Sequence, residues 1–334
     1  MSRPFALPPY FHPTTVVLVD DNEAFLQSVV LGMPPSIVMR GFLHPEEALA
    51  FVETPIDLPP LVDRCFTLER SHETEALIHL DLGLIEQEIK HLQRFRRISA
   101  VLIDYAMPSV DGIQFCERMT DPYARRAMLT GVADEKLAVQ AFNAGLIHRF
   151  ISKHRVNAVE AIIAFVAELE REYFQQHLVR LQAALAMDPP GFLIDLTIAR
   201  QVRRFIQQEG IVEYYLVNDP PGFLMLRSNG SVIRLVLLDQ AARRRQIDFV
   251  RAHDAPADVR RGIEQGELVG LFSGDSPDDY FGEEAYPWSD KVHPGRPLQA
   301  SEPWLMAVVR DAATDVDFDP ARSSYDAFLA SEQL

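Results

Sequence analysis

The sequence predicts an α/β fold: a doubly wound, five-stranded parallel sheet, followed by a smaller α+β region with an antiparallel sheet. Three observations lead to this expectation. Short apolar runs alternate with helical patterns over about the first 155 residues. Several of these runs end on acidic or polar residues. In the second half, two β-rich runs flank Asn229-Gly230, a pair suited to a tight type I′ hairpin turn.

Five strands are expected in the first half, and the run at 15–19, which is apolar without alternation, is typical of a strand buried on both faces of a parallel sheet. They lie at 15–19, 36–42, 100–104, 126–131 and 147–153. Helical spacing follows at 22–30, 44–52 and 133–145, with Pro45 at a favourable first helical position and Gly145 as a stop signal.

Polar side chains stand where these strands end. They are Asp20, Asp21, Asp104, Thr130 and Lys153. Because the carboxyl ends of parallel strands share one edge of the sheet, we expect these side chains to converge. Clustered carboxylates repel one another unless a cation lies among them, and oxygen ligands suit Mg²⁺. A nearby lysine offsets charge, and a threonine hydroxyl can reach an anion bound to the central aspartate.

Each of these residues alone is common as a helix cap or a solvated side chain, but their order along the chain is specific. The acidic pair Asp20-Asp21, the DxxMPxxDG stretch from Asp104 to Gly112, Thr130 in LTG and Lys153 in FISK resemble the receiver domain of bacterial two-component response regulators. The resemblance implies that Asp104 is the phosphoacceptor. Its phosphoryl group would come from a sensor histidine kinase or a phosphotransfer protein.

The same resemblance implies the remaining roles. Asp21, Asp104 and the backbone carbonyl of Ala106 would hold Mg²⁺, with Asp20 acting through water. Thr130 and Lys153 would contact the phosphate, and Thr130 and Phe150 would form the switch pair. Beyond its own phosphorylation and autodephosphorylation, the chain is not expected to be an enzyme.

Two features depart from the receiver pattern. His154 follows Lys153 where the family usually has proline. An insertion of about 54–98 separates the acidic pair from Asp104, with helical spacing near its end at Leu84, Ile85, Ile89 and Leu92. We expect it at the edge of the sheet, either as a surface elaboration or as a surface for a partner or a dimer.

The expected organisation is a receiver domain at 1–155, a connecting helix at 156–187 and an output domain at 188–334. The helix has no Gly or Pro and carries an apolar seam, so it is either an extension of the last receiver helix or a dimer helix. It would relay phosphorylation to the output domain by changed dimerisation, since a homodimer is expected, or by changed partner binding.

The output half is expected to contain a helix at 198–210, a hairpin around Asn229-Gly230, a last strand at 302–309 and a mobile acidic tail after Asp311. Its hairpin region, YYLVNDPPGFLMLRSNG, resembles a group of response regulators that includes quorum-sensing regulators of the Lqs type.

Charge and composition bound the alternatives. The formal charge of −16 argues against a general affinity for nucleic acids or anionic membranes. Basic clusters at Arg200/Arg203/Arg204 and Arg243–Arg245 are expected to be solvated or paired within the chain. Two cysteines and the lack of a long apolar run favour a cytoplasmic protein. A DNA-binding regulator and a nucleotide-binding or small-ligand-binding output domain stay open as alternatives.

Overall fold

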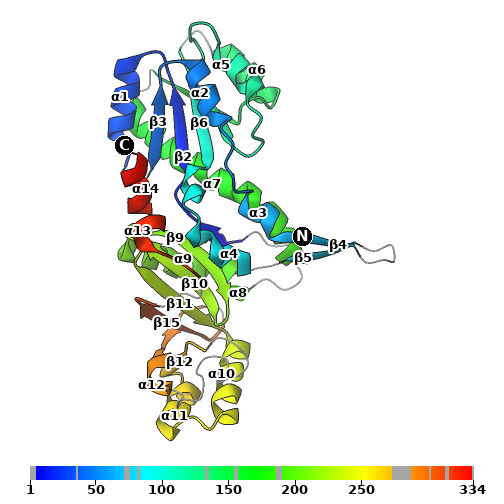
Figure 1. The fold of residues 1–334 in the computed structure, drawn as a ribbon, viewed down its shortest axis with the longest axis vertical. Helices are drawn as coiled ribbons and strands as arrows, with labels where there is room; N and C mark the ends of the chain where they lie inside the picture. Colours follow the sequence, from blue (N-terminus) through cyan, green and yellow to red (C-terminus); the bar gives the residue numbers. More distant parts are fainter. Residues whose placement is uncertain are drawn as a thin grey trace. The chain divides into compact units, whose positions relative to one another are not determined.

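The chain folds into two compact units in the computed structural model (Figure 1). Unit 1 comprises Met1–His12, Pro60–Leu92 and Leu181–Leu334, and unit 2 comprises Pro13–Pro59 and Gln93–Arg180. The structure describes residues 5–34, 37–70, 76–80, 83–131, 135–153, 157–185, 190–272, 287–300, 302–312 and 316–332.

Unit 2 contains the predicted five-stranded parallel sheet. Its strands are β2 (Thr15–Val19), β3 (Val38–Phe42), β6 (Ile98–Asp104), β7 (Arg125–Thr130) and β8 (Arg149–Ser152). The strand order is β3-β2-β6-β7-β8, and each neighbouring pair is parallel. Every residue of β2 and β6 is buried, as the uniformly apolar runs predicted.

Helices cover both faces of this sheet, which confirms the doubly wound class. They are α1 (Glu23–Gly32), α2 (Pro45–Val52), α5 (Gly112–Arg118), α6 (Glu135–Asn143) and α7 (Ala158–Leu185). Residues of α2, α5 and α6 share one apolar cluster with the sheet, and residues of α1 and α7 share another. The continuous α7 matches the long helix that the sequence predicted.

Unit 1 is an α+β structure on an antiparallel sheet, as expected for the output half. The sheet order is β1-β9-β10-β11-β15-β14. Its strands are β1 (Tyr10–Phe11), β9 (Ile211–Asn218), β10 (Pro221–Arg227), β11 (Val232–Leu238), β15 (Trp304–Arg310) and β14 (Arg296–Leu298).

Shorter elements complete unit 1. The helices that follow α7 are α8 (Gly191–Ile194), α9 (Leu196–Glu209), α10 (Gln240–Ala252), α11 (Ala257–Gln265), α12 (Trp288–Lys291), α13 (Pro320–Ser323) and α14 (Tyr325–Glu332). A second antiparallel pair joins β12 (Leu268–Gly270) to β13 (Val292–Pro294).

The units differ from the expected domain limits at two places. The N-terminal β1 pairs with β9, with Tyr10 opposite Tyr215, so this segment belongs to the output sheet and not to the receiver. Most of the insertion, Pro60–Leu92, also falls in unit 1. It was expected at the edge of the receiver sheet. Local patterns do not reveal which distant strand a segment meets, and this explains both differences.

The helical spacing near the end of the insertion corresponds to only a short helix. Its elements are α3 (Leu61–Arg64), β4 (Phe66–Arg70), β5 (Ala76–Leu80), α4 (Gly83–Gln87) and two 3₁₀ turns, η1 (Glu88–Lys90) and η2 (Leu92–Arg96). β4 and β5 form an antiparallel hairpin, and α4 lies against β9. Ile85 and Ile89 are fully buried, so the apolar spacing marked a packed face even though the helix is short.

The described part of the tail after Asp311, residues 316–332, is folded, whereas a mobile tail was expected. α13 and α14 are helical, and Tyr325 and Phe328 are buried. The backbone N–H of Asp326 donates to the carbonyl of Ser228 at 2.9 Å, which attaches α14 to the β10–β11 turn. Burial of two aromatic rings outweighs the acidic composition of the segment.

The predicted β10–β11 hairpin is present, but its turn differs from type I′. Gly230 has φ +81, whereas Asn229 is not among the residues with positive φ. Gly230 N–H donates to the Arg227 carbonyl at 2.9 Å. A type I turn followed by a left-handed glycine therefore joins the strands, a common three-residue hairpin connection.

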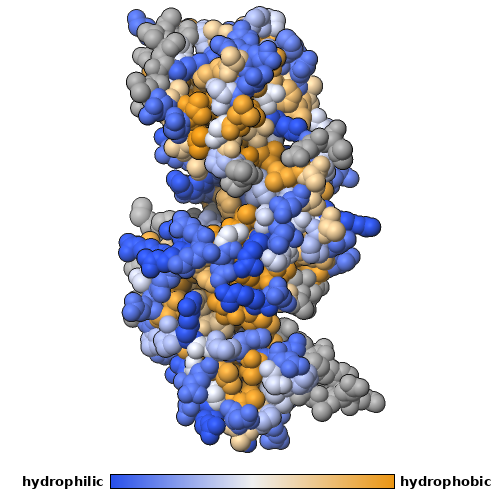
Figure 2. Space-filling model, turned by 90° about the vertical axis from the view of Figure 1, so that its left-hand side faces the viewer, coloured by the Kyte–Doolittle hydropathy of each residue, from blue (hydrophilic) through white to orange (hydrophobic). Residues whose placement is uncertain are grey.

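Hydrophilic and hydrophobic residues are both exposed on the surface. On the face shown in Figure 2, hydrophilic residues cover much of the surface and hydrophobic residues appear in separate patches. Large apolar side chains that are exposed include Leu31, Val139, Phe142, Phe150, Val179 and Leu196. Among the described residues, no helix combines the length and the apolar character needed to span a bilayer.

Candidate functional site

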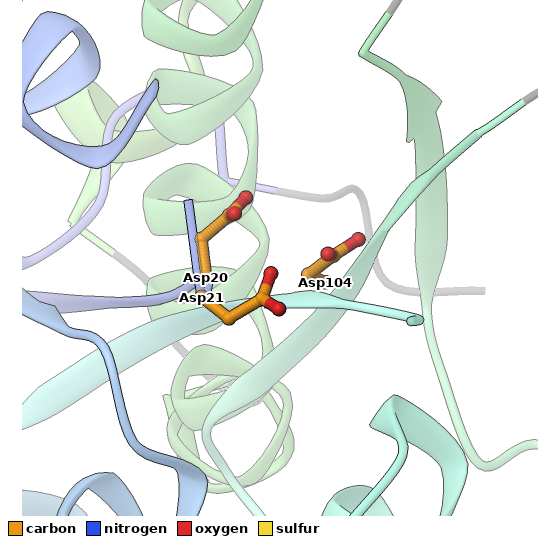
Figure 3. A group of neighbouring side chains, drawn as sticks. All are labelled: Asp20, Asp21 and Asp104. Carbon is orange, nitrogen blue, oxygen red and sulfur yellow. The ribbon is translucent and has the colours of Figure 1, made fainter. Parts of the chain in front are cut away.

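Three carboxylates meet at the carboxyl edge of the unit 2 sheet. Asp20 and Asp21 follow β2, and Asp104 ends the neighbouring strand β6, where Val19 pairs with Ile103. One oxygen from each carboxylate lies within 4.8 Å of the others (Figure 3). Asp20 and Asp104 are buried and Asp21 is exposed. The predicted convergence is therefore present.

Lys153 closes the site from β8. Its Nζ lies 2.5 Å from Asp20 Oδ2 and 2.8 Å from Asp104 Oδ2. Its backbone N–H donates to the carbonyl of Thr130 at 3.0 Å, which fixes the chain just past the strand. Because one ammonium serves two carboxylates, an excess of negative charge remains at this edge.

The protonation of Asp104 reflects these opposing influences. Burial raises the pKa of its carboxyl above the usual value. The hydrogen bond and the positive charge of Lys153 lower this pKa, the charge of Asp20 raises it, and a backbone hydrogen bond from Ala106 lowers it. Asp104 is therefore a carboxylate whose charge depends on its cationic neighbours.

The donor set fits a hard divalent cation. Asp20 Oδ2 is buried beside the Lys153 ammonium. Its other oxygen accepts from the N–H of Asn22 at 3.0 Å. Oxygen ligands with one exposed member, here Asp21, match the preference of Mg²⁺, which keeps several waters. An acidic group thus occupies the place where receiver domains generally bind Mg²⁺.

The other predicted residues lie around this cluster. Ala106 is exposed and follows Asp104 in the loop after β6. Thr130 is buried at the end of β7, and its hydroxyl donates to the carbonyl of Ile151 at 3.4 Å. Phe150 is 40% exposed on β8, with its ring edge-on to Phe142 at 6.5 Å. His154 lies outside the described residues.

Two further residues shape the site, and the sequence had assigned neither of them a role. Gly112 begins α5 so close to the strand end that an added Cβ would lie 2.7 Å from the Asp104 carbonyl oxygen. Its N–H donates to the Tyr105 carbonyl at 3.0 Å. Asn22 caps α1 by accepting from the Phe25 N–H at 3.1 Å. The Asp-Gly and Asp-Asn pairs were the only sequence signals for these positions.

A five-stranded parallel sheet in the order β3-β2-β6-β7-β8, with an acidic cluster and a lysine at its carboxyl edge, defines a receiver domain. In this arrangement the chain resembles response regulators. Over its full length it is similar to the Legionella pneumophila response regulator LqsR, with 29% identity and a TM-score of 0.77, covering 99% of each chain.

Two other solved structures match about half of the chain. One is an adenylate cyclase from Rhodopirellula baltica, with 20% identity and a TM-score of 0.35, covering 53% of this chain and 98% of the other. The second is a CheY-like receiver domain protein from Methanospirillum hungatei JF-1, with 18% identity and a TM-score of 0.32, covering 48% and 96%. No protein-family model matches the sequence, and no curated protein does.

Proposed function

We propose that Asp104 accepts a phosphoryl group from a sensor histidine kinase or a phosphotransfer protein. The observation that carries this proposal is the position of Asp104, which contacts Lys153 and lies beside two further carboxylates at the edge of the sheet. An Asp104 oxygen attacks phosphorus and forms an O–P bond. The N–P bond of the phosphohistidine breaks, and its electron pair returns to the histidine nitrogen.

Apart from Asp104, the residues of the site position this transfer rather than take part in covalent chemistry. Asp21, Asp104 and the Ala106 carbonyl are the proposed Mg²⁺ ligands, with Asp20 acting through water. When bound, Mg²⁺ would neutralise charge on the phosphoryl oxygens. Lys153 already contacts Asp104, so it is placed to pair with the phosphate that forms there.

The switch would follow from the new charge. The Thr130 hydroxyl holds only a 3.4 Å contact to the Ile151 carbonyl, so a phosphate oxygen is a stronger acceptor for it. Phe150, exposed and edge-on to Phe142, would change its position as Thr130 moves. Such a modification biases two existing states through charge-assisted hydrogen bonds.

The output would be relayed by α7 through a change in dimerisation or partner binding. The continuous helix from Ala158 to Leu185 supports this, because a helix without a break transmits displacement along its axis. We further propose a cytoplasmic homodimer that catalyses no reaction beyond its own phosphorylation and autodephosphorylation. The resemblance of the output half to Lqs-type regulators supports a role in quorum sensing.

The test is the intact mass of the full chain after incubation with acetyl phosphate and Mg²⁺. We expect one phosphoryl addition in the wild type and none in Asp104→Asn. Asp111→Asn is the matched control, because Asp111 is a half-buried aspartate of the same stretch that caps α5 and asparagine caps equally well. Addition that persists in Asp104→Asn would place the phosphoacceptor elsewhere.

A further inference from the structure

A pocket of about 340 Å³ lies within unit 1, between α9 and the edge strand β14. α9 supplies Gln201, Arg204, Phe205 and Gln208, which share one side of the helix by their spacing, and β14 supplies Arg296 and Leu298. The volume is at the lower end of the range for small-molecule sites, roughly 300–1,000 Å³.

The charged residues among the described lining of this pocket are all basic. Arg204 and Arg296 are exposed, and within the described part of the chain neither has an acidic partner. None of the described lining residues is acidic. The larger pocket of unit 1, about 620 Å³ beside α10, places Arg245 among Asp219 and Asp248 and so lacks this bias.

Other arginines of unit 1 already have hydrogen-bond or ion-pair partners. Arg203, adjacent to Arg204, donates to the backbone carbonyl of Ala6. Glu209, at the end of the same helix, is shared by Arg227 and Arg310, each at 2.5 Å. The acid nearest in sequence to Arg204 on α9 is therefore already engaged. The basic cluster that the sequence predicted to be solvated or paired separates into a paired Arg203 and a pocket-lining Arg204.

Two guanidinium groups without acidic partners favour an anion in a chain whose formal charge is −16. Guanidinium groups match phosphate oxygens with two parallel hydrogen bonds each, and the side-chain amide of Gln208 offers a further donor. Below them, Phe205 and Leu298 are buried and give the pocket an apolar base. A ligand with a phosphate and a flat apolar portion satisfies both parts.

A peptide added to the β14 edge fits this place less well. β14 has only three residues, and its central Pro297 has no N–H to donate. A concave pocket with two cations on an acidic chain also favours a compact anion over a DNA duplex, which needs an extended basic surface.

We propose that the α9–β14 pocket binds a small phosphate-bearing ligand of nucleotide size through Arg204 and Arg296. This site is separate from Asp104 and is independent of the phosphorylation proposed above.

The experiment uses the full chain in EDTA, so that chelation of Mg²⁺ does not contribute. Thermal denaturation and calorimetric titration are run with pyrophosphate, ADP, GTP, adenosine and a short DNA duplex. We expect pyrophosphate or a nucleotide to raise the Tm and adenosine to leave it unchanged. Arg204→Gln and Arg296→Gln each weaken binding by about tenfold or more, because each removes a charge-assisted contact to the anion.

Arg261→Gln, which changes an exposed arginine of α11, is the control and keeps wild-type affinity. Asp104→Asn also keeps it, which separates this site from the receiver site. The unliganded Tm of every variant shows that the chain is folded. Unchanged affinity in both pocket variants, no binding by any phosphate compound, or binding to the duplex alone would each overturn the proposal.

Discussion

The Nζ atom of Lys153 lies 2.8 Å from Oδ2 of Asp104. This contact joins the ends of two strands, β6 and β8, that are not neighbours in the sheet. Burial disfavours the charged form of Asp104, and the lysine offsets that effect. The ion pair therefore keeps a buried carboxylate available for chemistry.

Lys153→Met should raise the pKa of Asp104 further and destabilise the fold at neutral pH. We expect the free energy of unfolding to fall by about 1–3 kcal/mol, because two buried carboxylates lose their shared cation. Urea denaturation measures this change. Lys136→Met, on the exposed side of α6, is the control and should change stability by less than about 0.5 kcal/mol. An unaltered midpoint for Lys153→Met would contradict the role of the ion pair.

Mg²⁺ should stabilise the wild-type chain. Binding to the folded state alone adds about 2.7 kcal/mol at a ligand concentration one hundred times Kd. Asp21→Asn should remove most of this gain in stability, because it takes one carboxylate from the cluster and leaves the buried packing unchanged. The measurement is Tm against Mg²⁺ concentration. Asp258→Asn, an exposed change on α11, should titrate like the wild type.

Gly112→Ala should distort the loop that holds Asp104. A Cβ at this position would lie 2.7 Å from the Asp104 carbonyl oxygen and 3.1 Å from Tyr105 Cα, both backbone atoms that cannot move alone. We expect a loss of about 1–3 kcal/mol and slower phosphorylation by acetyl phosphate. In contrast, Ser109→Gly should be neutral or stabilising, because Ser109 has φ +70. Wild-type phosphorylation rates in Gly112→Ala would show that the close approach is unimportant.

Glu170 should make stability depend on pH. Burial on α7 raises the pKa of its carboxyl to about 7, partly opposed by the hydrogen bond from Thr14 at 2.9 Å. Between the ordinary value of 4.5 and about 7, the folded chain holds a proton that the unfolded chain has lost. The free energy of unfolding therefore falls as pH rises through this window and is constant above it.

Glu170→Gln removes the titrating group, so it should flatten this pH dependence and stabilise the chain above pH 7 by up to about 3 kcal/mol. Chemical denaturation at pH 5, 6, 7 and 8 gives the comparison. Glu160→Gln, on the first turn of the same helix, should retain the wild-type slope. Parallel pH profiles for the wild type and Glu170→Gln would rule out Glu170 as the source.

Phe328→Ala tests the ordered C-terminal helix. Phe328 is fully buried, so its truncation should cost about 3–5 kcal/mol. Arg322→Ala, whose side chain is 86% exposed, should cost little. Guanidinium denaturation measures both. Equal stability of the two variants would show that the C-terminal helix contributes nothing to the fold, as expected of the mobile tail that the acidic composition suggested.

Local patterns along the chain determined most of unit 2 and its site. The apolar runs of β2 and β6 fixed both strands, and a parallel sheet then brings their terminal aspartates to one edge. The apolar spacing from Ile198 and the stop at Gly210 likewise indicated α9, since a left-handed glycine ends a helix through contacts within a few residues.

Tertiary structure alone decided which distant segments meet. The pairing of β1 with β9, the place of the insertion in unit 1 and the burial of Phe328 depend on partners far along the chain. Arg204 and Arg296 line one pocket for the same reason. A periodic sequence pattern indicates which face of an element is apolar. Which other element covers that face is decided by the packing of the whole unit.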